Sequence, residues 1–158
     1  MATTVMSLNP SAAEMPSANS AQWVVSSTDE LVIAFDASAT ENVIWKGIMP
    51  QIYADTSLVA HIWYKMLTAT SGSVQWNVYV ESIGDAESGD VNSFDGLNTS
   101  GAITVPVSAS TMDVVGVSLT NADSAAAGEK VRIKLERDAA SDTATGDAYV
   151  YLVEIRAA

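Results

Sequence analysis

The sequence has no cysteine and only one histidine, His61, among its 158 residues. Without cysteine there is no disulfide framework, no thiolate metal site and no cysteine nucleophile. A Ser-His-Asp triad needs an imidazole beside an exposed serine, and the chain has no Gly-x-Ser-x-Gly turn to present that serine. No glycine-rich run has the spacing of a phosphate-binding loop. We therefore expect a protein that is not an enzyme and that carries no cofactor.

Basic residues are also few, since seven Lys and Arg stand against nineteen Asp and Glu, for a net charge of −12. This charge has the wrong sign for neutralising phosphates or for binding an anionic membrane surface. Apolar runs such as residues 31–35 fall far short of the ~20 residues of a spanning helix. We expect neither nucleic acid nor a membrane as a partner. The first residues lack the regions of a secretory signal, so we expect synthesis in the cytoplasm.

The acidic residues show no pattern that selects two of them as a catalytic pair for glycoside hydrolysis. Calcium is the one metal that oxygen ligands alone would hold, but neither acidic segment has the spacing of an EF-hand. We therefore expect no bound metal. The carboxylates that calcium would have to use are Asp85, Glu87, Asp90 and Asp95 in one segment and Asp138, Asp142 and Asp147 in the other.

From residue 21 onward the chain is a succession of short segments rich in Val, Ile, Trp and Tyr, separated by Gly, Asp, Asn and Ser. Period-2 alternation in such segments predicts strands. Nine strands favour an all-β fold, a jelly-roll or two-sheet β-sandwich over residues 21–158. Residues 1–20 are interrupted by two prolines and predict an extended N-terminal arm that becomes ordered on a partner. The predicted strands are 22–26, 31–35, 42–48, 58–68, 73–82, 103–107, 112–120, 130–138 and 148–156.

Two of these strands, in residues 58–67 and 148–155, are apolar on both faces. A strand of that kind is covered on both faces, and no predicted helix is available to cover it. Charged residues make up only 16% of the chain, where about 25% is usual, which also favours an oligomer. We expect a subunit interface at the second faces of these strands and at the apolar residues of the arm: Val59, His61, Trp63, Tyr149, Tyr151, Val5, Met6 and Leu8.

Four of the seven basic residues lie in residues 130–138. Arg132 and Lys134 on the outward face of this strand predict either a docking stripe for a neighbouring subunit or cross-strand pairing with Glu154 or Asp147. Exposed aromatic rings would bind sugars by stacking, and Trp63 and Trp45 are the candidates, with a subunit interface as the alternative. A third tryptophan, in the strand at 73–82, alternates into the core.

Several runs of the chain resemble a known class of proteins, and the resemblance covers residues 43 to 156. They are Trp-Lys-Gly-Ile-Met-Pro-Gln-Ile-Tyr at 45–53, Gly-Ser-Val-Gln-Trp-Asn-Val at 72–78, and the turns and strand edges of 127–138 and 142–148. These runs resemble small β-sandwich virion proteins of tailed bacteriophages, above all the capsid decoration, or cement, proteins of the head.

The resemblance implies a homotrimer on the outer surface of the phage capsid, made in the host cytoplasm, with the major capsid protein as its partner. The arm at residues 1–20 would clamp the trimer to the shell, and no catalytic residues carry over. An alternative is a carbohydrate- or receptor-binding module of a phage tail, which would use Trp63 or Trp45. A glycan-cleaving enzyme is a third and more distant hypothesis.

Overall fold

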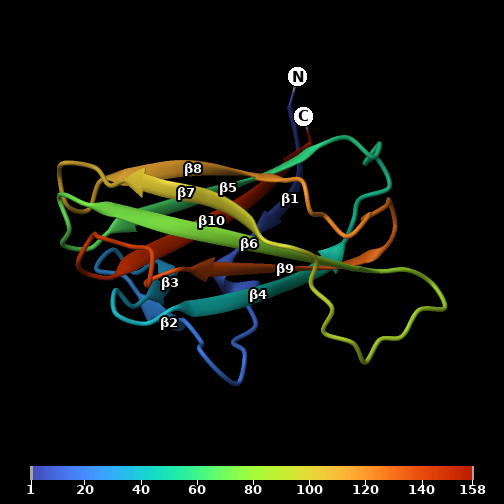
Figure 1. Cartoon of the computed structure of the whole chain (residues 1–158), viewed down its shortest axis with the longest axis horizontal. Helices are drawn as coiled ribbons and strands as arrows, with labels where there is room; N and C mark the ends of the chain where they lie inside the picture. The colour runs from blue at the N-terminus through green and yellow to red at the C-terminus, as the bar shows by residue number, and fades with distance from the viewer. Residues whose placement is uncertain (1, 158) are drawn as a thin grey trace.

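The computed structural model describes residues 2–157 and confirms the all-β prediction (Figure 1). Each of the nine predicted strands is present, although the segment predicted at 103–107 lies earlier, at Asn98–Thr104. In order, the elements are β1 (Thr3–Leu8), the 3₁₀ helix η1 (Pro10–Ala12), β2 (Gln22–Val25), β3 (Leu31–Phe35), β4 (Glu41–Ile48), β5 (Leu58–Met66), β6 (Ser73–Ile83), β7 (Asn98–Thr104), β8 (Met112–Leu119), β9 (Lys130–Arg137) and β10 (Ala148–Ala157). In the described part of the chain, no helix combines the length and hydropathy needed to cross a bilayer.

The strands form two antiparallel sheets that pack face to face (Figure 1). The six-stranded sheet has the order β2-β3-β10-β5-β8, and β1 pairs with β10 beside β3. The four-stranded sheet has the order β4-β9-β6-β7. Alternate side chains of each strand point between the sheets, and the others form two outer faces.

The core lies between the sheets and centres on Trp76, which has no exposed surface. Phe35 and Tyr64 contact its ring edge-on, with centroids at 5.2 and 5.4 Å. The predicted core position of this tryptophan is confirmed. Trp45 is also buried, with 1% of its surface exposed, and its indole N–H donates to the Asn9 carbonyl at 2.7 Å. Trp45 therefore offers no ring to a sugar, and that prediction is wrong.

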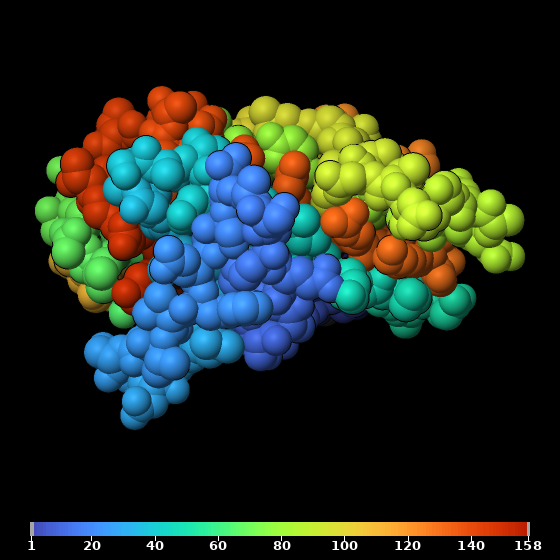
Figure 2. Space-filling model, turned by 90° about the horizontal axis from the view of Figure 1, so that it is seen from below, coloured from blue at the N-terminus to red at the C-terminus, as the bar shows by residue number. Residues whose placement is uncertain are grey.

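The prediction of a separate N-terminal arm is wrong for the described residues 2–20. β1 pairs with β10 over Thr3–Leu8, and Leu8 is buried against the core. The next residues continue along β4 through bridges from Glu14 to Ile44 and from Ser20 to Asn42. In Figure 2 this blue segment lies on the body of the molecule. The physical reason is that β3 pairs with only three residues of β10, so the rest of that edge needs another strand.

Arg137 joins the two sheets at the end of β9, where it has no exposed surface. Its Nε donates to the Asp142 carboxylate at 2.6 Å, and its Nη1 donates to the carbonyls of Phe35 and Gly146 at 3.1 and 3.0 Å. Phe35 ends β3 of the opposite sheet, and Gly146 precedes β10. One side chain thus joins the end of β9 to the loop at 142–146 and to the distant end of β3.

Candidate functional site

The structure divides the residues predicted for an interface among three places. Those of β5 and β10 lie together on the outer face of the six-stranded sheet, because their neighbours along each strand are buried. Arg132 and Lys134 lie on the outer face of the four-stranded sheet, on the other side of the molecule. Val5, Met6 and Leu8 lie in β1 and pack against the protein's own core.

The outer face of the six-stranded sheet centres on Trp63 of β5. Trp63 pairs with Val114 of β8 on one side and with Leu152 of β10 on the other. The register of β10 shifts between Val150 and Leu152, so Tyr151 is an extra residue in a β-bulge. A bulge redirects side chains, and here both Tyr151 and Leu152 line one pocket with Trp63.

This pocket has a volume of about 340 Å³ and opens on the outer face of the sheet. Its apolar part consists of Trp63, Tyr151, Leu152 and Met112, and its polar rim consists of Asn9 and Glu30. Asn9 follows β1 and Glu30 precedes β3, so two connections bring these polar groups to the aromatic rings. We call this set of six residues the aromatic pocket.

Polar groups around the aromatic rings are few. The Nζ of Lys65 lies 5.5 Å from the ring centroid of Tyr151. The indole N–H of Trp63 is covered and has no acceptor among the described residues. An unsatisfied donor of this kind costs about 1–3 kcal/mol, so it favours any partner that supplies an oxygen.

His61 lies on the same face, two residues before Trp63, but it does not line the aromatic pocket. Burial and then the nearby Arg156 guanidinium hold the pKa of His61 below its usual value. Its ring lies opposite Gly116 of β8, which leaves space beside it. The imidazole is therefore neutral at pH 7 and packs beside β8.

Neither acidic segment considered for calcium forms a cluster. In residues 2–157 no three His, Asp or Glu side chains come together in a way that would hold a metal ion. Glu87 accepts from the Gly84 backbone N–H at 2.7 Å, and Asp95 accepts from the N–H groups of Gly96 and Asp123. These bonds lower the pKa of Asp95. The carboxylates order the loop that follows β6.

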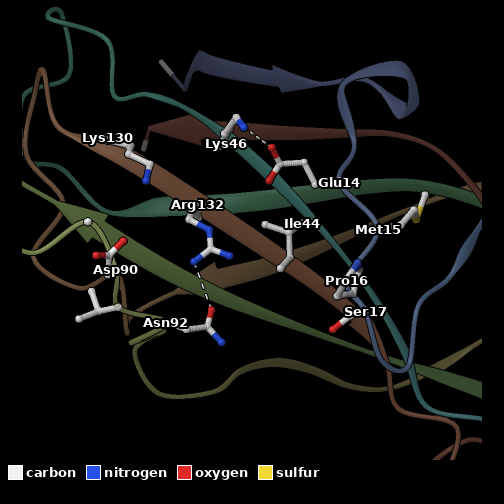
Figure 3. A pocket seen from close by; sticks show the side chains of 12 residues that line it. Glu14, Met15, Pro16, Ser17, Ile44, Lys46, Asp90, Asn92, Lys130 and Arg132 are labelled. Carbon is white, nitrogen blue, oxygen red and sulfur yellow. Dashed lines mark hydrogen bonds and ion pairs between the residues drawn. The ribbon is translucent and has the colours of Figure 1, made fainter.

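The outer face of the four-stranded sheet carries a second and larger hollow of about 570 Å³ (Figure 3). Ile44 and Lys46 of β4 and Lys130 and Arg132 of β9 form its floor. Residues 14–17 form one wall and residues 89–92 form the other. We call it the basic groove. The sequence indicated the basic residues but gave no signal that two distant segments would enclose them.

Cross-strand pairing of the β9 cations is confirmed, but the predicted partners are wrong. Arg132 pairs with Glu81 of β6 at 2.7 Å, and Lys134 lies over the ring of Tyr79, 4.0 Å from its centroid. Glu154 belongs to the other sheet, where it bonds with Arg156. β9 pairs with β4 and β6, so the partners of Arg132 and Lys134 come from β6 and from the loop residues Asn92 and Phe94.

No known family model matches this sequence, and no curated protein matches it. Among solved structures, the chain is similar to TmCBM61 in complex with β-1,4-galactotriose, with a TM-score of 0.50, 10% identity, and coverage of 92% of this chain and 87% of that one. It also matches the xylan-binding module CBM15, with a TM-score of 0.49, 12% identity and coverage of 92% and 89%. A third match is the carbohydrate-binding module CBM6cm-2 from Cellvibrio mixtus lichenase 5A in complex with cellotriose, with a TM-score of 0.48, 10% identity and coverage of 99% of both chains.

The chain has a jelly-roll β-sandwich fold. Its two antiparallel sheets and its likeness to TmCBM61 agree on this, and identities near 10% show the fold alone. The fold implied by the resemblance to phage virion proteins is therefore confirmed. The part of that resemblance that concerns capsid decoration is not tested by a likeness of fold and stays a prediction.

Proposed function

We propose that this protein is a carbohydrate-binding β-sandwich without catalytic activity, which holds a neutral glycan in the aromatic pocket. The observation that carries this proposal is that Trp63 and Tyr151 line one open pocket whose rim supplies Asn9 and Glu30. Ligand sites commonly combine an apolar, aromatic lining with a few polar groups that fix the orientation.

A sugar ring has an apolar face of C–H groups and an edge of hydroxyls. The apolar face stacks on an aromatic ring, as in other contacts that bury aromatic area, and the hydroxyls bond to carboxylate and amide groups. The aromatic pocket supplies both kinds of partner.

The charge of this face favours a neutral glycan over an acidic one. The carboxylate of Glu30 lies at the rim and forms no ion pair among the described residues. The Glu30 carboxylate would repel the carboxylates or sulfates of an acidic polysaccharide at this pocket. The fold is compatible with such a function, since TmCBM61, to which the chain is similar, was solved in complex with β-1,4-galactotriose.

Isothermal titration calorimetry with neutral oligosaccharides tests this proposal. We expect binding to at least one of the β-linked galactose, xylose, mannose and glucose series, and a loss of about tenfold or more in affinity in Trp63→Ala and Tyr151→Ala. Trp23→Ala is the matched control, because Trp23 is 50% exposed and lies outside the aromatic pocket. Binding that is equal in Trp63→Ala and in the control would overturn the proposal. Release of reducing sugar from these ligands would contradict the absence of catalysis.

Self-association is the second candidate for the same face. Met112 and Val114 of β8 are 44% and 39% exposed beside Trp63, and they widen its apolar surface. Light scattering across a size-exclusion column decides between the two, because a trimer that Val114→Lys converts to monomers would assign the face to subunit contact. Capsid decoration, with the major capsid protein as partner and the virion surface as location, stays a prediction of the resemblance.

A further inference from the structure

The basic groove gathers an unusual share of the positive charge of an acidic protein. Three of the seven Lys and Arg residues line it: Lys46, Lys130 and Arg132. Lys46 pairs with Glu14 across one wall. The other two cations lie on the same side of β9, two residues apart, so their Cα atoms are separated by about 6.6 Å.

Arg132 is held in place before any ligand arrives. Its Nη1 donates to Glu81 at 2.7 Å and to Asn92 at 3.2 Å. Its guanidinium also lies over the ring of Phe94, 5.0 Å from the centroid. The Glu81 carboxylate is buried and also accepts from the Ser93 backbone N–H at 2.6 Å, so it cannot move away. The plane of the guanidinium is therefore fixed.

The same contacts leave part of the guanidinium free. Arginine has five N–H donors, and both protein bonds of Arg132 use Nη1. Within residues 2–157, no acceptor bonds to its Nε or Nη2, and neither atom is a buried donor without a partner. This free edge has the fork geometry that binds a carboxylate through two parallel hydrogen bonds.

Lys130 adds a cation that has no partner in the described part of the chain. Among the described residues it forms no ion pair within 4.0 Å. In Figure 3, its ammonium and the guanidinium of Arg132 point into the same space from β9, opposite Asp90 and Asn92. The groove thus presents a guanidinium edge and an ammonium group together with the polar side chains of Ser17, Asp90 and Asn92.

We propose that the basic groove is a second saccharide site, which binds the carboxylate of a uronic-acid unit. Arg132 would hold the carboxylate in two parallel bonds, Lys130 would neutralise its charge, and the polar side chains of the walls would bond to the ring hydroxyls. The choice of a saccharide rests on the proposed function, whereas the choice of a carboxylate rests on the groove alone. The two outer faces would then bind glycans of different charge.

Isothermal titration calorimetry with trigalacturonate tests this proposal. We expect binding to the intact protein and a loss of about tenfold in affinity in Lys130→Gln and in Arg132→Lys, because the first removes a charge and the second removes the two-bond fork. Arg132→Lys keeps a cation beside the buried Glu81 and removes only the fork. Arg156→Gln is the matched control, because it removes one positive charge from the other sheet.

Three outcomes separate this site from the aromatic pocket. Trigalacturonate binding that survives Trp63→Ala but falls in Lys130→Gln supports the groove, even if no neutral glycan binds to the protein. Equal affinity of the control and of both groove variants would overturn the proposal. Binding of a sulfated trisaccharide as tight as that of trigalacturonate would overturn the preference for a carboxylate. Urea midpoints of all variants, measured alongside, show that each remains folded.

Discussion

The buried ion pair between Arg137 and Asp142 gives the sharpest prediction about stability. Both side chains are almost fully buried, and Asp142 also accepts from the Gln75 backbone N–H at 2.6 Å. Asp142→Asn keeps the shape but removes the negative charge and turns one acceptor into a donor. The guanidinium is then left without its counter-charge in the interior. Breaking one partner of a buried pair costs about 3–5 kcal/mol, and we expect a loss of that size.

Urea unfolding, followed by tryptophan fluorescence, measures this loss. With a slope of about 2 kcal/mol per molar urea, the midpoint should fall by roughly 1.5–2.5 M. Glu154→Gln is the control, since it breaks a partly exposed pair with Arg156, and we expect a much smaller shift. A loss in Asp142→Asn below about 1 kcal/mol, or equal to that of the control, would refute the reasoning about burial.

Three further predictions concern other parts of the fold. Gly72→Ala should destabilise the protein more than Gly89→Ala in a thermal melt, because Gly72 has a φ of 89° and its added Cβ would lie 2.7 Å from the Ala144 backbone, whereas Gly89 faces open space. Leu8→Ala should lower the free energy of unfolding by about 2–4 kcal/mol in urea, because Leu8 is buried in the core. An unchanged midpoint would mean that β1 does not contribute to the stability of the fold. The Ser82 hydroxyl and the Ala126 N–H lower the pKa of Glu129. The stability that this carboxylate contributes is therefore present above pH 4.5 and is lost as the pH falls further. Between pH 5 and pH 3, the urea midpoint of Glu129→Gln should fall less than that of the unmodified protein.

The acid sensitivity of the fold should come from the carboxyls with lowered pKa values, Glu129, Asp95 and Glu154. Each of them contributes stability above its unfolded pKa, and this stability is lost as the pH falls through the folded pKa.

Local pattern was enough to predict most of the strands and the fold class. Period-2 alternation needs only neighbours along the chain, so eight of the nine segments from Gln22 to Arg156 and the core position of Trp76 followed from the sequence, whereas β7 was predicted too late in the chain. β1 did not, because a short segment next to prolines forms a strand only when a free edge is available. That edge on β10 exists because β3 pairs with only three of its residues, which no local signal shows.

The two candidate sites depended on tertiary structure. The residues around Trp45 are apolar in succession, so alternation could not say which face is buried, and the structure excluded Trp45 while leaving Trp63 on the surface. The pocket beside Trp63 required the bulge at Tyr151. The basic groove required residues 14–17 and 89–92 to fold onto β4 and β9 from distant parts of the chain. The sequence alone determined which aromatic, basic and acidic side chains are available. Long-range packing decided which of these side chains lie together in a pocket.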